Sequence, residues 1–266
     1  MTPASNPHVA FEKAAARGIH RNVIAILSKR ADLQERDVLD FACGDGRTTH
    51  LLRQLGARVT PCDLFPEHYK LEDKPLSIDI RDASALPTAS ADLIVLQEVI
   101  EHLPDQLGAL REMARTLRPG GEVFLTTPNR SSLAAKLSFM LFESENIKLT
   151  PWGAHNSIWG ADVGAHGRQY YGHLWLIGMQ QLRALALLAG FAEMQVQRTE
   201  ISRTSLLLLP LVYPILVLIT IRATLRALGK TSDTVARREI VEQCKLNINP
   251  RNLINKFLVV VLKKAN

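Results

Sequence analysis

The sequence is poor in cysteine and lacks the segments that mark a secreted or repetitive protein. Its three cysteines, Cys43, Cys62 and Cys244, form neither a C-x-x-C pair nor a metal-binding spacing. The first seven residues are polar rather than a charged and then apolar leader, and the chain contains no repeat or low-complexity tract. We therefore expect a reducing, cytoplasmic compartment, no disulfides, and a single domain over residues 1–266.

Charge is unevenly distributed along the chain, whose formal net charge is +6. From Arg198 to the end there are 12 Lys/Arg and 4 Asp/Glu, whereas residues 1–197 hold 20 basic and 22 acidic residues. The C-terminal quarter is therefore basic and the remainder is nearly neutral. A basic segment of this kind is typical of binding to nucleic acid or to an anionic membrane.

A long apolar run lies inside the basic quarter. Residues 204–221 are 18 uncharged and mostly aliphatic residues, a borderline length for a transmembrane helix. Pro210 and Pro214 predict a kink, and a single crossing would separate the strand predicted at 255–263 from its sheet. We therefore expect 203–230 to form a kinked hairpin or amphipathic element that dips into one leaflet of an anionic membrane. Burial in the core or in a dimer interface is the alternative.

The run from Val38 to Thr49 predicts a ligand-binding turn between a buried strand and a helix. Small residues at Ala42, Gly44 and Gly46 let backbone N–H groups approach a ligand closely. The dinucleotide pattern G-x-G-x-x-G is missing its third glycine, because Thr49 occupies that position. An acid, Asp40, also precedes the turn, where it would repel a pyrophosphate and suit an ammonium or sulfonium group.

Several further motifs follow in a fixed order. Asp63 ends a second predicted strand 17 residues after Gly46, where its carboxylate can accept both hydroxyls of a ribose. The other motifs are Asp82-Ala-Ser-Ala-Leu-Pro87, Glu101-His-Leu-Pro104, Leu117-Arg-Pro-Gly-Gly121 with Thr127-Pro-Asn129, and the helix stop Ala189-Gly-Phe191.

Together these motifs resemble class I S-adenosylmethionine-dependent methyltransferases over about residues 17–200. The likeness is greatest to the quinone-biosynthesis and other small-molecule O-methyltransferases. The resemblance implies an α/β fold with a doubly wound, mostly parallel, seven-stranded sheet and an antiparallel last strand. We expect strands at 37–41, 58–62, 76–80, 92–97, 122–127, 192–198 and 255–263, a leading helix at 10–30 and a helix at 180–189.

The resemblance also implies how the site is organised. Residues 129–180 would form a cap over the methyl acceptor, and residues 203–250 would be an apolar and basic insertion between the last two strands. Asp82 would contact the adenine amino group. The residues expected to bind S-adenosyl-L-methionine are Asp40, Ala42, Gly44, Gly46, Asp63, Leu64, Asp82, Ala83 and Gln97.

Methyl transfer from a sulfonium needs proximity and, for a hydroxyl acceptor, a base. His102 follows a strand at the ligand-binding edge of the sheet, and His166 lies in an H-x-R-x-Y stretch of the cap, so both are candidate bases. Shaping of the pocket or of the cap is the alternative for each, and His155 and His173 are weaker candidates. The cap histidines lack close ligand spacing and an accompanying carboxylate cluster, so no metal site is predicted.

The sequence therefore predicts an S-adenosylmethionine-dependent methyltransferase. Its acceptor would be an oxygen of a hydrophobic or lipid-linked small molecule, at the inner face of the membrane. A nucleic-acid methyltransferase is the first alternative, but no aromatic-rich basic groove accompanies the charge, and Thr127-Pro-Asn129 replaces the N/D-P-P-Y/F motif of base-amino methylases. A non-catalytic membrane scaffold that retains the fold is the second.

Overall fold

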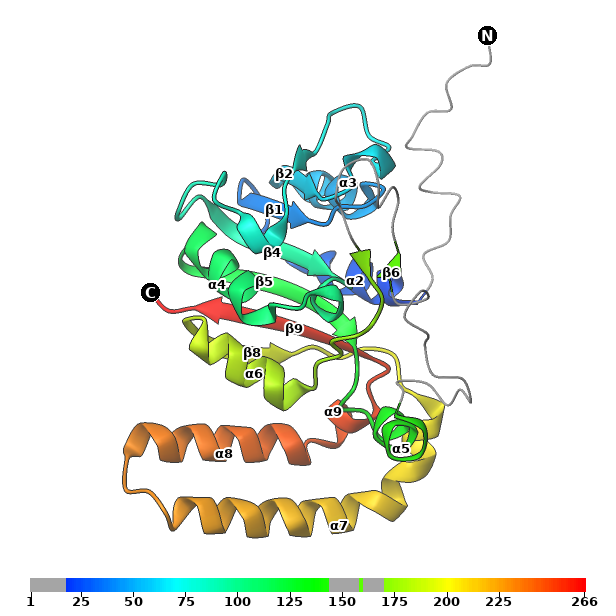
Figure 1. Cartoon of the computed structure of the whole chain (residues 1–266), viewed down its shortest axis with the longest axis vertical. Coiled ribbons are helices and arrows are strands. Elements are labelled where there is room, and N and C mark those ends of the chain that lie inside the picture. The colour runs from blue at the N-terminus through cyan, green and yellow to red at the C-terminus, as the bar shows by residue number, and fades with distance from the viewer. Residues whose placement is uncertain (1–17, 144–157, 160–169) are drawn as a thin grey trace.

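The chain folds around a seven-stranded sheet, in a computed structural model that describes residues 18–143, 158–159 and 170–266 (Figure 1). The strand order is β3-β2-β1-β4-β5-β9-β8, and β9 runs antiparallel to both of its neighbours. This confirms the predicted doubly wound, mostly parallel sheet with an antiparallel last strand. The strands are β1 (Asp37–Phe41), β2 (Arg58–Asp63), β3 (Leu76–Ser77), β4 (Ala91–Gln97), β5 (Leu117–Pro128), β8 (Phe191–Val196) and β9 (Phe257–Lys264), and a separate pair is formed by β6 (Ile158–Trp159) and β7 (Tyr170–Tyr171).

Helices cover both faces of the sheet, so neighbouring strand residues enter two different cores. Ile94 and Leu125 pack with α4 and α6 on one face, while Leu93 and Phe124 pack with α2 and α3 on the other. Burial on both faces explains why the central strands are almost continuously apolar. The helices are α2 (Ile19–Leu27), α3 (Arg47–Gln54), α4 (Gln106–Thr116), α5 (Leu133–Phe142), α6 (Met179–Leu188), α7 (Arg203–Leu228), α8 (Thr234–Ile248) and α9 (Pro250–Ile254), with short 3₁₀ turns η1 (Pro66–His68), η2 (Ile80–Asp82) and η3 (Ile100–His102).

Two strand boundaries differ from the predicted ones by more than two residues. The third strand is only Leu76–Ser77, because the chain turns into η2 at Ile80 instead of continuing as a strand. The fifth strand starts at Leu117 rather than at residue 122, since Pro119 to Gly121 are absorbed in a shift of register against β4. Both changes affect the ends of strands and leave the central sheet as expected.

The segment between β8 and β9 forms a helical hairpin. Its first arm is α7, a single assigned helix of 26 residues that includes Pro210 and Pro214. Figure 1 shows that α7 changes direction within its yellow N-terminal part and then runs alongside α8. The Tyr213 hydroxyl donates a hydrogen bond to the carbonyl of Ile248, at 2.8 Å, and so joins the first half of α7 to the end of α8.

The hairpin is joined to the rest of the fold along α8 and at its base. Arg183 of α6 forms an ion pair with Glu239 of α8, and Gln180 donates to Asn247 at 2.7 Å. At the base, the buried Asn129 side chain at the end of β5 donates to the carbonyl of Asn255 at 2.7 Å. These contacts fix the direction of α7 relative to the sheet.

Candidate functional site

The turn after β1 forms one wall of the site. Gly44 and Gly46 have positive φ angles of 54° and 88°, and Ala42, which stands where the resembling family usually has glycine, has a φ of 57°. A left-handed conformation costs a residue with a Cβ about 1–2 kcal/mol. Ala42 therefore adopts the left-handed conformation although it has a Cβ. The surrounding structure must hold the backbone in this conformation.

Asp63 holds the turn in place from the end of β2. Its buried carboxylate accepts two backbone hydrogen bonds, from Gly44 N and from Phe65 N, each at 2.8 Å. Parallel strands bring their carboxyl ends to the same edge of a sheet, and there ligands bind in doubly wound folds. Asp63 thus joins the turns that follow β1 and β2.

A cavity of about 660 Å³ opens beside Asp63. Its lining is mostly apolar and includes Asp63, Ala42, Leu64 and His102, four residues predicted from the sequence. An apolar pocket with a few acids and a histidine suits an aromatic base attached to a ribose. The other lining residues are Phe41, Phe65, Ile78, Asp79, Ile80, Leu96, Val99, Leu103 and Pro104.

Asp40 is fully buried and lacks a cationic partner among the described residues. Its Oδ2 accepts a hydrogen bond from Thr49 Oγ1 at 2.6 Å, while Oδ1 has no hydrogen-bond partner there. Burial and, to a smaller extent, the charge of Asp63 together raise the pKa of Asp40 to about 7, although the hydrogen bond from Thr49 opposes the shift. Gln97 is similar, since its Nε2 donates to Thr48 but its Oε1 is unpartnered among the same residues. These two acceptors fit the ammonium group of S-adenosylmethionine.

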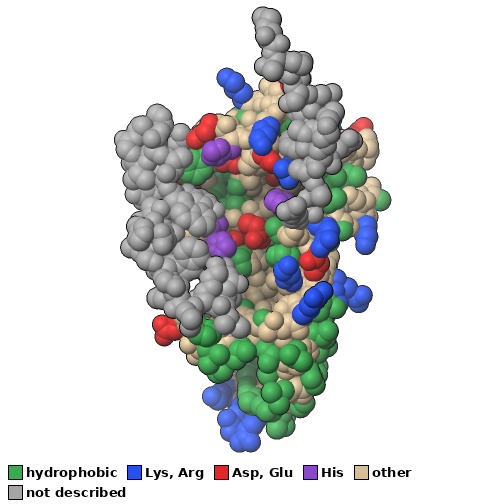
Figure 2. Space-filling view, turned by 90° about the vertical axis from the view of Figure 1, so that its right-hand side faces the viewer, with side chains coloured by type: hydrophobic (Ala, Val, Ile, Leu, Met, Phe, Trp, Pro, Cys, Tyr) green, Lys and Arg blue, Asp and Glu red, His purple; other side chains and the backbone are tan. Residues whose placement is uncertain are grey.

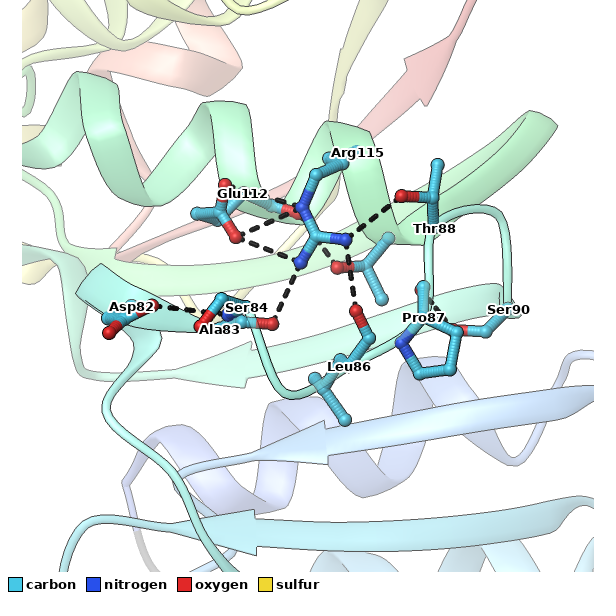
Figure 3. Close-up of polar contacts among 10 residues, drawn as sticks. Asp82, Ala83, Ser84, Leu86, Pro87, Thr88, Ser90, Glu112 and Arg115 are labelled. Carbon is cyan, nitrogen blue, oxygen red and sulfur yellow. Dashed lines mark hydrogen bonds and ion pairs between the residues drawn. The ribbon is translucent and has the colours of Figure 1, made fainter.

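Asp82 and Ala83 lie outside this cavity, unlike Asp79. The Asp82 side chain is exposed and accepts a hydrogen bond from Ser84 N at 3.3 Å. Figure 3 shows that Arg115 of α4 holds the adjoining loop, donating to the carbonyls of Ala83 and Leu86. Because the chain forms η2 over Ile80–Asp82, the acid that lines the pocket is three residues earlier than the one the motif indicates.

Glu101, His102 and His173 meet at the mouth of this pocket. Glu101 is 0% exposed, and its Oε2 accepts a hydrogen bond from Thr127 Oγ1 at 2.9 Å. The Nε2 atoms of His102 and His173 each lie 4.0 Å from Glu101 Oε1, and their ring centroids are 4.9 Å apart. Burial and the nearby Glu98 raise the pKa of Glu101 to about 8.

Little in the sequence indicates that His173 belongs to this cluster. Two contacts hold its loop against η3: Trp175 N donates to the carbonyl of Glu101 at 3.1 Å, and Gln106 Nε2 donates to the carbonyls of Ile100 and Trp175 at 2.8 and 2.7 Å. A glutamine in the first turn of α4 is the only local signal, and its partners become apparent only in the fold. The candidate base His166, like His155, lies outside the described residues.

A second cavity, of about 950 Å³, is lined in part by His173. Its lining includes Glu98, Arg130 and Lys256, together with small residues of α5 and the residue that caps α7. Glu98 has a φ of 51°, unusual for a residue with a side chain, and its Oε1 accepts a hydrogen bond from Thr126. The sequence predicted an acceptor cap over 129–180 but identified neither Glu98 nor Lys256. The remaining lining residues are Pro128, Asn129, Ser132, Ala134, Ala135, His173, Leu176, Ser202 and Phe257.

The fold and the site together define a class I S-adenosylmethionine-dependent methyltransferase. The defining features are the sheet order, the turn of small residues after β1 and the acids at the ends of β1 and β2. A family model described as a methyltransferase domain matches residues 11–196, and the chain belongs to that family. S-adenosylmethionine is therefore its methyl donor.

Curated relatives are matched over part of their length. The chain is similar to a ubiquinone biosynthesis O-methyltransferase of Xanthomonas oryzae, with 37% identity over 141 residues, which cover 49% of this chain and 58% of the relative. A Xylella fastidiosa protein of the same name is 34% identical over 139 residues, covering 48% and 56%. The chain thus spans little more than half the length of these relatives.

A solved structure supports the fold over nearly the whole chain. The structure of a SAM-dependent methyltransferase from Archaeoglobus fulgidus is matched with a TM-score of 0.53 at 16% identity, covering 92% of this chain and 94% of that one. At this identity the likeness shows the shared fold.

Substitution of Gly46 tests the shape of the turn. A Cβ at Gly46 would lie 2.9 Å from the Tyr69 ring and 3.0 Å from Leu71, whereas a Cβ at Gly190, which also has a positive φ, meets nothing within 4 Å. We expect both Gly46→Ala and Gly190→Ala to destabilise the fold by about 1–2 kcal/mol. Only Gly46→Ala should weaken S-adenosylmethionine binding, about tenfold, as measured by calorimetry. Equal affinities in the two variants would contradict this role of the turn.

The raised pKa of Asp40 predicts a pH-dependent stability. The unfolded chain ionises Asp40 near 3.8 and the folded chain near 7, so stability present below pH 3.8 is lost as the pH rises through 7. Asp40→Asn should therefore raise the free energy of unfolding of the ligand-free protein at pH 8, by at most about 4 kcal/mol, and weaken cofactor binding.

Asp32→Asn is the matched control for this measurement. Hydrogen bonding to Arg30 lowers the pKa of Asp32 to about 2, so this carboxylate stabilises the fold above pH 3.8 and that contribution is lost as the pH falls toward 2. Asp32→Asn should accordingly lower stability at pH 8. Denaturant titrations at pH 5 and pH 8 would measure both variants. A shift of the same sign in both would contradict the assignment for Asp40.

Proposed function

We propose that this methyltransferase acts on an oxygen of a hydrophobic or lipid-linked small molecule at the cytoplasmic face of a membrane. The observation that carries the proposal is an exposed apolar helix next to the second cavity. Ser202, which caps α7, and Ala134 and Ala135 of α5 line that cavity, so its wall continues into both helices. The names of the curated relatives, which are O-methyltransferases of ubiquinone biosynthesis, agree with such an acceptor.

The apolar surface of α7 is large and lacks a cover among the described residues. Only Ser205 of this helix is buried. Among the described residues, α7 is the one helix that is long and apolar enough to cross a membrane. Leu207, Leu211 and Leu218 are 79%, 73% and 69% exposed, and the same stripe continues at helical spacing. Figure 2 shows hydrophobic side chains gathered at the lower end of the molecule, with Lys and Arg at its tip. The exposed residues of α7 are Leu206, Leu207, Leu211, Ile215, Leu218, Ile219, Ile221 and Leu225.

The contacts of α8, the second arm of the hairpin, favour an orientation in which α7 lies in the membrane surface and does not cross the membrane. Helix α8 contacts α7 and is also joined to α6 by the ion pair between Arg183 and Glu239. None of its residues is buried, and it carries charged residues such as Arg237 and Arg238. A helix held beside a charged partner and a soluble domain suits one leaflet, with Arg222 and Arg226 at the headgroups.

The described residues supply the elements that the transfer reaction requires. Asp40, Asp63 and the turn after β1 would hold the cofactor, whose sulfonium supplies the methyl group. The second cavity would hold the acceptor, with its apolar part toward α5 and α7. His102 lies at the boundary of the cofactor pocket, where it can receive the proton of an acceptor hydroxyl. Alignment of the acceptor oxygen with the methyl group then contributes most of the rate, as in other in-line displacements.

Transfer to a lipid fraction tests the acceptor class. We expect the protein, incubated with S-adenosylmethionine labelled in the methyl group and a bacterial membrane lipid extract, to place the label in an organic-soluble product identified by mass spectrometry. Asp63→Ala should abolish both the product and saturable cofactor binding, because it releases the turn that carries Gly44. Label that appears only in RNA or DNA, with salt-steep binding, would contradict the proposal and support a nucleic-acid methyltransferase.

Vesicle flotation tests the role of α7. We expect the protein to float with vesicles containing 30% phosphatidylglycerol and to float less with pure phosphatidylcholine, since burial of a Leu or Ile side chain stabilises binding by about 1.5–3 kcal/mol and the arginines favour anionic headgroups.

The paired variant Leu207→Asp/Leu211→Asp should lose flotation. The control Ile24→Asp/Leu188→Asp changes two exposed residues of α2 and α6 and should keep it. Unchanged flotation in the α7 variant would contradict the proposal. A dimer in light scattering that the α7 variant converts to a monomer, without any flotation, would assign this face to a second copy of the chain.

A further inference from the structure

We propose that Glu101, His102 and His173 form a binding site for a divalent transition-metal cation. Each of the three side chains offers one ligand atom, and these atoms all lie within 4.8 Å of one another. Two imidazole nitrogens and one carboxylate oxygen are a ligand set that proteins use for zinc and for iron(II). The sequence did not predict the site, because 70 residues separate His102 from His173.

The strongest observation is the orientation of one carboxylate oxygen. Glu101 is completely buried, and Thr127 satisfies its Oε2, but Oε1 has no hydrogen-bond partner among the described residues. Leaving a buried carboxylate oxygen without a partner is costly. This oxygen lies 4.0 Å from the Nε2 atoms of both His102 and His173, beyond the length of a hydrogen bond. A cation between the three atoms would give this carboxylate oxygen its missing partner.

Their separation is close to that of ligand atoms around a bound cation. With metal–ligand bonds of about 2.1 Å, two ligand atoms of a tetrahedral site lie about 3.4 Å apart. The two observed distances of 4.0 Å to Glu101 Oε1 therefore require a contraction of about 0.6 Å, and the two imidazole nitrogens, which lie within 4.8 Å of each other, require one of up to about 1.4 Å. Rotation of His173, whose side chain is 31% exposed, can supply it, while Glu101 stays fixed by its bond to Thr127.

The surrounding charges favour a dication. Glu98 lies three residues before Glu101 in the sequence, and it lines the same cavity as His173. Two carboxylates and two imidazoles present a net negative site to a cation. The imidazole nitrogens favour manganese, iron, cobalt or zinc over magnesium, which prefers oxygen ligands.

The position of the site gives the cation a role that rests on the proposed function. His102 lines the cofactor pocket and His173 lines the second cavity, so the cation would lie where the two meet. With the cation bound, His102 would act as a ligand instead of as the base. Three protein ligands leave coordination positions for the acceptor, and a bound hydroxyl loses its proton to solvent more readily. The resulting oxyanion forms the new C–O bond, the C–S bond breaks, and its electron pair stays on the sulfur of the neutral thioether. Acceptors with two adjacent hydroxyls would bind best, because both oxygens can reach the cation.

Titration with Mn²⁺ alone tests the site without acceptor or cofactor. Full-length protein stripped with EDTA should bind about one Mn²⁺ per chain, measured as loss of the electron paramagnetic resonance signal of the free ion. Glu101→Gln and His173→Ala should each weaken binding at least tenfold. His20→Ala, at an exposed histidine of α2, should leave the affinity unchanged. His173→Ala keeps the test valid if the buried Glu101 variant fails to fold.

Unchanged Mn²⁺ affinity in His173→Ala would overturn the site. An EDTA-stripped protein that binds no Mn²⁺ and still transfers methyl groups at the full rate would overturn it as well. These outcomes leave the acceptor proposal in place. A protein that binds one Mn²⁺ through His173, yet methylates no lipid-extract component, would keep the metal site and overturn the acceptor proposal.

Discussion

The two hydrogen bonds accepted by Asp63 are the constraint on which the site depends. They join the turn after β1 to the turn after β2 across the carboxyl edge of the sheet. The same geometry places Asp40 and Asp63 on adjacent strands, so that the charge of Asp63 raises the pKa of the buried Asp40. A positively charged ligand relieves this repulsion, whereas a pyrophosphate would increase it. The selectivity for a sulfonium cofactor over a dinucleotide therefore follows from the sheet and from two acids, rather than from the glycine pattern alone.

The sequence predicts those parts of the site that lie at the ends of central strands. Two buried strands end near Asp40 and at Asp63, and Ala42 and Gly44 follow the first of these strands. The parallel sheet brings the ends of the two strands together whatever the conformation of the loops. It does not predict which acid of the third strand reaches the pocket, because that depends on where the strand stops: the 3₁₀ turn over Ile80–Asp82 exposes Asp82 and leaves Asp79 on the lining. It also does not predict that His173 meets Glu101, since backbone hydrogen bonds between distant loops have no local pattern.

For helix α7 too, the sequence predicts the apolar character of the segment but not its position in the fold. The apolar run and its prolines predict an interrupted element near a membrane, but not that the chain continues as one assigned helix of 26 residues beside a charged partner. The two cores on either side of the sheet are complete without it, because their members come from the strands and from α2, α3, α4 and α6 together with short connecting segments. The exposed aliphatic side chains of α7 therefore belong to neither core of the described residues. A partner surface outside this chain accounts for them better than the fold does.

Four successive positions at the end of β5 connect the chemistry to the hairpin. Thr126 donates to Glu98 and Thr127 to Glu101, while Asn129, two residues later, donates to the backbone of Asn252 and Asn255 at the base of the hairpin. The acids at the junction of the two cavities and the base of the apolar hairpin are thus positioned by one rigid strand end. An acceptor that stays partly in lipid has to present its oxygen close to the membrane surface. The strand end places the reactive groups and the hairpin in one fixed geometry, so the depth of α7 in a leaflet would set which part of such an acceptor reaches the methyl group.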